Sequence, residues 1–270
     1  MRALLKKIVL WAGVPFEYFE EKRFLGRADV NELSKLKDKF KGERCFILGN
    51  GPSLNKLDLN LLKDEYSFAV NGIFYKTEEM GYKPTFYVVE DTAVMKENIE
   101  RIKEYEVEYK FFPARYKKYF RAKHRKNILF FYLNEGFYIK GRGNFEFPRF
   151  SQDASDRLYC GQSVTIVNLQ LAYFLGFSEI ILIGMDFDSH IPDTAKVNGD
   201  VIVSTEDDVN HFHPQYFGKG KTWHDPKLHN VLKSYRLCKF IYEEHGRKII
   251  IATKGGRLEI FPRRDFYSLF

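Results

Sequence analysis

A loop rich in aromatic residues and glycine carries most of the side chains that could do acid–base chemistry. It spans residues 210–226 and contains His211, His213 and His224. Histidine can take a proton from a hydroxyl group near neutral pH, because its ordinary pKa lies there. We predict that His211 is such a general base, since it follows a polar segment next to which an acceptor would bind. A structural hydrogen-bonding role stays open for each of the three.

The same loop offers donors for a leaving phosphate. A leaving phosphate needs hydrogen-bond donors where negative charge develops. Tyr216, Lys219 and Lys221 lie close to His211 in the sequence and carry such donors. These four residues form the predicted catalytic set.

A metal ion is the alternative use of these side chains. His211 and His213, together with Asp186 and Asp188, contain nitrogen and oxygen ligands for a divalent cation. Their spacing is loose compared with a dedicated metal motif. We therefore predict no metal site and no cofactor.

A short apolar strand leads into a glycine-rich turn. Residues 45–48 are apolar without alternation, and Gly49-Asn50-Gly51-Pro52-Ser53 follow. Glycines bring main-chain N–H groups close to a ligand, and a following helical turn would aim its positive end at a phosphate. The turn therefore indicates a nucleotide site, although a tight strand-to-helix turn also requires glycine without any ligand.

Polar residues follow other predicted strands as well. The carboxyl ends of parallel strands meet at one edge of a sheet, so Asn50, Asn71 and Asp91 would face one cleft. A second strand-end site follows residues 179–183. The predicted nucleotide-binding positions are Gly49, Asn50, Gly51, Pro52, Ser53, Asn71, Asp91, Gly161, Ser163, Gly184 and Asp186.

Strand and helix patterns alternate along the chain, which predicts an α/β fold with a Rossmann-like, mostly parallel sheet and helices on both faces. The expected strands cover residues 45–48, 67–70, 84–89, 109–112, 128–132, 179–183 and 248–252. The expected helices cover residues 31–41, 58–63, 74–80, 96–106, 163–175 and 227–245. Residues 189–217 are polar and rich in aspartate, and they predict a mobile lid.

Composition favours one catalytic domain over residues 41–270, preceded by a helical extension over residues 1–40. The chain has 270 residues, of which 44% are hydrophobic, and this suffices for a full core. Cys45, Cys160 and Cys238 are far apart and lie in apolar contexts, as expected of free thiols in a reducing cytoplasm.

The charge pattern bears on partners. The net charge is +7, which could serve an anionic substrate or anionic lipid. Residues 1–19 mix cations with apolar side chains, as a helix at a lipid interface does, although packing on the domain is the ordinary alternative. Residues 115–126 interleave aromatics and cations, but no nucleic-acid motif accompanies them. No apolar run of about 18 residues occurs, so we expect a cytoplasmic protein with peripheral contact at the inner face of the membrane.

Four motifs resemble a known family when they are taken together. They are GNGPSL at residues 49–54, VNGIFY at 70–75, LGFSEIILIGMDF at 175–187 and NHF at 210–212. In this order they resemble the bacterial sialyltransferases of glycosyltransferase family 42. MptE-like and flagellin-glycosylation sequences, including those of surface-polysaccharide loci, look closer still at the C-terminal end. The resemblance covers roughly residues 44–261 and implies a GT-A-like sialyltransferase variant of the Rossmann-like fold, using a CMP-activated acidic sugar without a metal.

The resemblance also implies residue roles. Asn50, Gly51 and Ser53 would hold the nucleotide, Asn71 would contact the ribose and phosphate region, and His211 matches the family's general base. The departure is Asp188, where those sialyltransferases place one of two tyrosines that contact the leaving phosphate. This substitution leaves the sugar donor open.

Three functions are consistent with these residues. The first is a glycosyltransferase that moves a sialic-acid-like or Kdo-like sugar from a CMP-activated donor to a surface glycan or glycolipid. The second is an MptE-like diphosphokinase that moves pyrophosphate from ATP to a pterin alcohol, with Mg²⁺ on Asp91, Asp186 or Asp188. The third is a non-catalytic component of polysaccharide assembly. The acceptor, the linkage and a homo-oligomeric state stay open.

Overall fold

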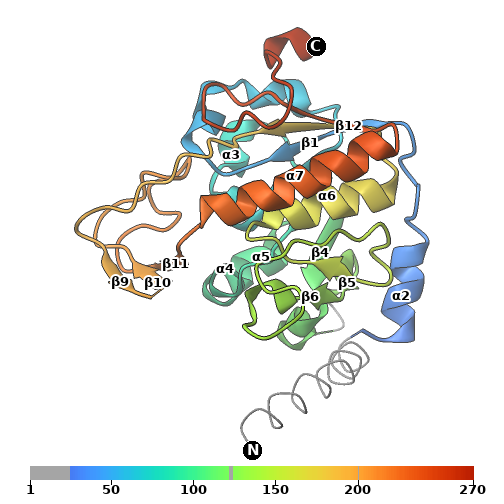
Figure 1. The fold of residues 1–270 in the computed structure, drawn as a ribbon, viewed down its shortest axis with the longest axis horizontal. Helices are drawn as coiled ribbons and strands as arrows, with labels where there is room; N and C mark the ends of the chain where they lie inside the picture. The colour runs from blue at the N-terminus through green and yellow to red at the C-terminus, as the bar shows by residue number, and fades with distance from the viewer. Residues whose placement is uncertain (1–24, 122–123, 200) are drawn as a thin grey trace, which may run out of the picture.

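The computed structural model describes residues 25–121, 124–199 and 201–270 (Figure 1). Its centre is a seven-stranded sheet with the order β12-β8-β1-β2-β3-β4-β5, and all neighbouring strands run parallel. The strands are β1 (Arg44–Leu48), β2 (Ser67–Val70), β3 (Phe86–Val88), β4 (Tyr109–Pro113), β5 (Ile128–Phe131), β8 (Glu179–Ile183) and β12 (Lys248–Ile251). The predicted α/β class with a Rossmann-like parallel sheet is confirmed.

The strand order reverses next to β1. From β1 the chain adds β2 to β5 on one side, and it later adds β8 and β12 on the other side. Such a switch point opens a crevice beyond the carboxyl ends of the two central strands, because their connections leave in opposite directions. The crevice here lies beyond β1 and β8.

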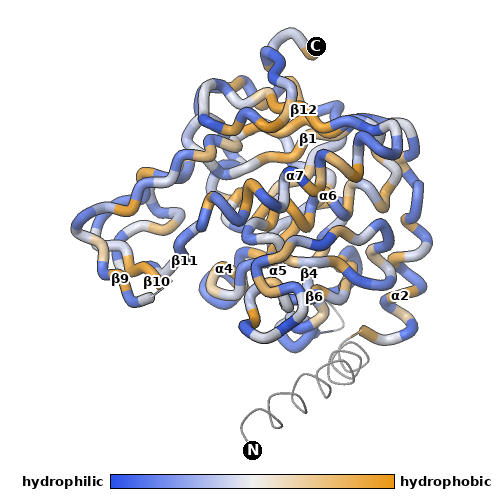
Figure 2. Tube along the Cα trace, in the orientation of Figure 1, coloured by the Kyte–Doolittle hydropathy of each residue, from blue (hydrophilic) through white to orange (hydrophobic). Residues whose placement is uncertain are grey.

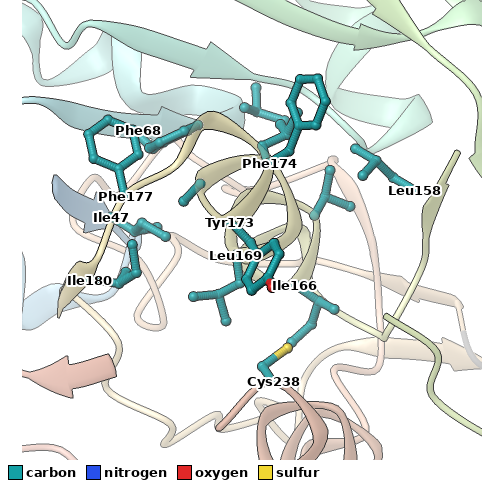
Figure 3. Packing of buried hydrophobic residues seen from close by; sticks show 14 of the residues in the cluster. Ile47, Phe68, Leu158, Ile166, Leu169, Tyr173, Phe174, Phe177, Ile180 and Cys238 are labelled. Carbon is teal, nitrogen blue, oxygen red and sulfur yellow. The ribbon is translucent and has the colours of Figure 1, made fainter. Parts of the chain in front are cut away.

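Two long helices cover one face of the sheet. These are α6 (Val164–Leu175) and α7 (Leu228–Glu244), which lie side by side in Figure 1. Ser163 caps α6 by accepting a hydrogen bond from the Thr165 N–H, and Gly176 ends the helix with a φ of 96°. Every residue of α6 after Val164 is buried, so this mostly apolar helix is enclosed on all sides. Figure 3 shows its side chains packed against those of the strands.

Shorter elements cover the other face and the edge of the sheet. The expected helix at residues 58–63 is a single 3₁₀ turn, the one at 74–80 is a 3₁₀ turn followed by a short α-helix, and the one at 96–106 is divided at Asn98. The elements are α2 (Arg27–Ser34), α3 (Thr77–Met80), α4 (Thr92–Glu97), α5 (Ile99–Glu104), η1 (Pro52–Lys56), η2 (Leu59–Leu62), η3 (Asn71–Tyr75), η4 (Ala114–Tyr119), η6 (Gly136–Tyr138) and η7 (Tyr267–Leu269).

The central strands are buried on both faces. In β1, Cys45 and Ile47 face the α6 side, whereas Phe46 and Leu48 face the opposite core, and all four are fully buried. This explains why the strand reads as an apolar run rather than an alternating one. Figure 2 shows the apolar colour along β1.

The beginning of the described chain belongs to the domain. Leu33, Leu36 and Phe40 pack into the core on the α6 side. The predicted interfacial segment at residues 1–19 lies outside the described residues. Among the described residues, no helix is both long and apolar enough to cross a bilayer.

The predicted lid region contains secondary structure that the sequence pattern did not indicate. β9 (Lys196–Asn198), β10 (Val201–Val203) and β11 (Thr222–His224) form a three-stranded antiparallel sheet that projects from the body (Figure 1). The C-terminal part of the predicted lid region is anchored, because Phe212 and Tyr216 are buried in the core of the main domain. A second small sheet pairs β6 (Leu133–Asn134) with β7 (Leu158–Tyr159).

Candidate functional site

A cavity of about 1060 Å³ opens at the carboxyl ends of β8, β1, β2 and β3. Its floor consists of strand-end residues, and its walls come from the start of α6, the start of α7 and residues 210–217. This volume suits a nucleotide or a nucleotide-sugar. The predicted site residues that line it are Gly49, Asn50, Gly51, Asn71, Asp91, Ser163, Gly184, Asp186, His211 and Tyr216.

Three main-chain donors of the glycine-rich turn are bonded within the protein. The Gly49 N–H donates to the carbonyl of Ile183 (2.8 Å), and the Gly51 N–H donates to the carbonyl of Gly184 (3.0 Å). The Ser53 N–H and hydroxyl both donate to the carboxylate of Asp186, at 3.3 and 2.7 Å. These donors are therefore already bonded within the protein, and Asp186 places a carboxylate at the start of η1.

The glycines are required by the close approach of β8. A Cβ on Gly49 would lie 2.4 Å from the carbonyl oxygen of Gly184, and a Cβ on Gly51 would lie 1.9 Å from Oδ2 of Asp186. Both distances are far inside van der Waals contact. The glycines of the turn thus allow two neighbouring strands to pack closely. Pro52 and Ser53 do not line the cavity.

Two amide side chains on the floor have unused acceptors. The Asn50 Nδ2 donates to the carbonyl of Val70 (3.0 Å) and to the hydroxyl of Tyr216 (2.8 Å). The Oδ1 atoms of Asn50 and Asn71 are buried and have no hydrogen-bond partner within the described chain. An unpaired buried acceptor costs about 1–3 kcal/mol, so both oxygens fit the N–H or O–H donors of a ligand.

Tyr216 places a hydroxyl next to these amides. Its oxygen accepts hydrogen bonds from Asn50 Nδ2 and from the Gly72 N–H (3.4 Å), which leaves its own proton for another acceptor. Burial raises the pKa of Tyr216 above its ordinary value, so the hydroxyl stays protonated. Tyr216 can therefore act as a hydrogen-bond donor in the cavity.

His211 forms a pair with a buried carboxylate. Its Nδ1 lies 2.8 Å from Oδ2 of Asp208, and its ring stacks on Tyr216 with centroids 4.2 Å apart. Asp208 also accepts the N–H groups of Asn210 and Phe217. Burial would raise the pKa of Asp208, but the hydrogen bonds and charge of His211 outweigh it, so this pKa lies below its ordinary value. With Nδ1 held by a carboxylate, Nε2 is the nitrogen able to accept a proton.

The two lysines of the predicted catalytic set lie elsewhere. Lys221 Nζ donates to the carbonyl of Gln215 (2.7 Å) and to the hydroxyl of Tyr75 (3.1 Å), and Lys219 is exposed. Neither residue lines the cavity. The chain turns them outward after Tyr216, so they are not placed to contact a ligand with His211.

The three histidines are separated by the fold. His213 stacks on Tyr75, with centroids 4.8 Å apart, and does not line the cavity, whereas His224 is an exposed residue at the cavity wall. Of the remaining predicted positions, Gly161 packs beneath the wall against Ile166 and Ser234, and Asp91 caps α4 through the Val94 N–H. Among the described residues, no three His, Cys, Asp or Glu side chains gather as a metal site would require.

The sequence interpretation missed Asp208, Glu90 and Arg115. Asp208 stands three residues before His211, and that spacing was the available signal. Arg115 pairs with Glu135 (2.6 Å) and donates to the main-chain carbonyl of Glu90 (3.0 Å), joining two parts of the cavity wall. Burial raises the pKa of the Glu90 carboxyl to about 7, although Arg115 opposes the shift.

Comparison with known proteins identifies the family. The model of the family described as "6-hydroxymethylpterin diphosphokinase MptE-like" matches residues 22–191, which is more than half of the chain. The chain belongs to the MptE-like family. The family match covers the strand ends from β1 to β8 and stops before the segment that contains His211.

A solved structure shows a looser likeness. The MAf glycosyltransferase from Magnetospirillum magneticum AMB-1 aligns with 90% of this chain at 15% identity and a TM-score of 0.49. The alignment covers 39% of that protein, so this chain spans well under half of its length. A search of curated protein sequences finds no match.

Proposed function

We propose that this MptE-like protein is a glycosyltransferase that moves an acidic sugar from a CMP-activated donor to a hydroxyl of a surface glycan or glycolipid. The observation that carries the proposal is the Asp208–His211 pair, whose free nitrogen belongs to a residue lining the cavity at the switch point. Deprotonating an acceptor hydroxyl is the chemistry that such a pair supports, because the carboxylate stabilises the imidazolium that forms.

The transfer needs one proton acceptor and one hydrogen-bond donor from the protein. His211 Nε2 takes the proton of the acceptor hydroxyl as its oxygen bonds to the anomeric carbon of the sugar. The bond from that carbon to the phosphate oxygen breaks, and CMP leaves with the electron pair. The Tyr216 hydroxyl would donate to the departing phosphate, and this donor takes the place of the tyrosine absent at Asp188.

The nucleotide would be recognised by the strand-end amides. The free Oδ1 atoms of Asn50 and Asn71 suit the amino group of a cytosine or the hydroxyls of a ribose. The start of α6 at Ser163 also lines the cavity, and the positive end of this 12-residue helix favours an anionic group there. No step requires a metal ion.

The family description supports a second candidate, an ATP-dependent pterin diphosphokinase. That reaction requires Mg²⁺ on acidic residues of the cavity. The carboxylates do not converge: Asp186 is bound by Ser53, Asp91 caps α4 and Asp188 faces Arg257. The carboxylates of the described residues are therefore poorly arranged to bind Mg²⁺ together.

Thermal-shift measurements with CMP, CDP, UDP, GDP and ATP, each with and without Mg²⁺, separate the two candidates. A ligand at a hundred times its dissociation constant adds about 2.7 kcal/mol to stability. We expect CMP to stabilise the protein most, and Asn50→Ala and Asn71→Ala to remove the effect. A shift with ATP that depends on Mg²⁺ would instead support the diphosphokinase.

A further inference from the structure

A closed loop forms part of the cavity rim. The Glu146 N–H donates to the carbonyl of Phe137 (2.9 Å), which joins the two ends of residues 137–146, and Asn144 is buried beneath them. Tyr138, Lys140, Phe145 and Glu146 also line the cavity. We call residues 137–149 the rim loop.

The rim loop exposes large apolar side chains to water. Phe147 is 68% exposed, the largest fraction for a large hydrophobic residue in the described chain, and Ile139 and Tyr138 are 45% and 42% exposed. Single exposed apolar residues are ordinary on protein surfaces. Three of them lie on the rim loop, beside a ligand cavity, and this concentration requires an explanation.

Cations accompany the apolar side chains. Lys140 and Arg149 are exposed on the same loop, and the whole chain carries a net charge of +7. Aromatic and aliphatic groups interleaved with Lys and Arg match the boundary of an anionic bilayer, where apolar groups enter the acyl region and cations meet the headgroups. An apolar protein surface by itself would not account for the flanking positive charge.

We propose that the rim loop docks on the surface of an anionic lipid bilayer, with Ile139 and Phe147 inserted and Lys140 and Arg149 at the headgroups. Docking in this orientation places the cavity mouth at the membrane surface. The inference rests on the exposed loop alone and does not depend on which sugar or nucleotide the cavity binds.

Vesicle co-sedimentation of the full chain tests the proposal. We compare vesicles of phosphatidylcholine alone with vesicles that also contain phosphatidylglycerol. Binding should occur to the anionic vesicles and weaken as salt is raised. The double variant Ile139→Asp/Phe147→Asp should lower the partition coefficient by about tenfold or more, because two apolar side chains lose their burial in lipid. Phe240→Asp is the matched control, since Phe240 is 57% exposed but lies on α7.

A label at the loop separates it from any other part of the chain that binds lipid. The three native cysteines are buried, so Phe147→Cys and Phe240→Cys can each be labelled with an environment-sensitive fluorophore. The label at position 147 should shift to shorter wavelength when anionic vesicles are added, and the label at position 240 should not. The nucleotide-induced thermal shift of both variants shows whether the cavity is intact.

Three results would overturn the proposal. The first is a wild-type protein that does not bind anionic vesicles. The second is a label at position 147 that stays in water, or an Ile139→Asp/Phe147→Asp variant that binds like the wild type. The third is self-association of the wild type, removed by the same variant in analytical ultracentrifugation without vesicle binding, which would make the rim loop an interface between copies.

Discussion

The floor of the cavity and one of its walls use their polar groups in opposite ways. In the turn at residues 49–53, the main-chain donors of Gly49, Gly51 and Ser53 are all bonded to β8 or to the segment that follows it. In residues 208–217, a buried carboxylate holds one nitrogen of His211 and leaves the other nitrogen unbound by that carboxylate. The main chain of the turn fixes the shape of the cavity, and residues 208–217 supply its proposed base.

This difference limits what a motif can predict. A glycine in a strand-end turn indicates that another group approaches the main chain closely, and that group can be a neighbouring strand as well as a phosphate. A histidine in an irregular loop reports little until its partner is known.

Replacing the proposed base should have the largest effect. His211→Ala should lower sugar transfer by roughly a hundred- to ten-thousand-fold, because no other group takes the acceptor proton, while CMP affinity stays within a few-fold. Release of CMP from a CMP-activated donor in the presence of acceptor is the measurement. His213→Ala is the control, since His213 stacks on Tyr75 outside the cavity. Equal losses in the two variants would remove His211 from its assigned role.

Asp208→Asn should have the next largest effect. The amide keeps the shape but cannot stabilise a charged His211, so kcat should fall by about tenfold to a thousandfold with KM little changed.

The Asp208→Asn variant should also change the stability of the protein at acid pH. Because the pKa of Asp208 is lowered in the folded state, its contribution is full above the ordinary carboxyl pKa of 3.8 and is lost as the pH falls below it. Urea unfolding at pH 3 and pH 6 should therefore show a smaller pH difference in the variant.

Gly51→Ala distinguishes a packing turn from a ligand turn. Its φ of −71° suits alanine, but the new Cβ would meet Asp186 and Gly184, so the variant should lose about 1–3 kcal/mol of stability. Gly143→Ala has open space around its Cβ and should change stability by less than about 0.5 kcal/mol. A Gly51→Ala protein of normal stability that no longer binds nucleotide would return the phosphate site to this turn.

Glu90→Gln tests the cavity floor at the end of β3. Its pKa is raised to about 7 by burial, from an ordinary 4.5, so the folded protein holds the proton more tightly than the unfolded chain does. Wild-type stability should therefore fall as the pH rises from 4.5 to 7. Glu90→Gln removes this loss and should be more stable than the wild type by about 1–3 kcal/mol at pH 8, with a smaller difference at pH 5. Chemical denaturation across this range is the measurement, and parallel curves would show that Glu90 is ordinarily solvated.

Local sequence patterns were enough to predict the parallel sheet and the main helix α6. Apolar runs such as residues 45–48 and 179–183 fixed the buried parallel strands, since a strand covered on both faces must be apolar along its length. Ser163 and Gly176 fixed the limits of α6, because capping is a local property of the chain. The predicted convergence of Asn50, Asn71 and Asp91 on one cavity followed from the rule that parallel strands end at the same edge.

Which polar groups face the cavity depends on contacts between segments that are distant in the sequence. The partner of the Ser53 N–H is Asp186, which is 133 residues away, and no local pattern shows that this carboxylate fills the expected phosphate position. Lys221 was near His211 in sequence, yet the chain turns it toward Tyr75 and away from the cavity. Local sequence sets the backbone conformation, whereas contacts between distant segments set the direction and the pairing of each side chain.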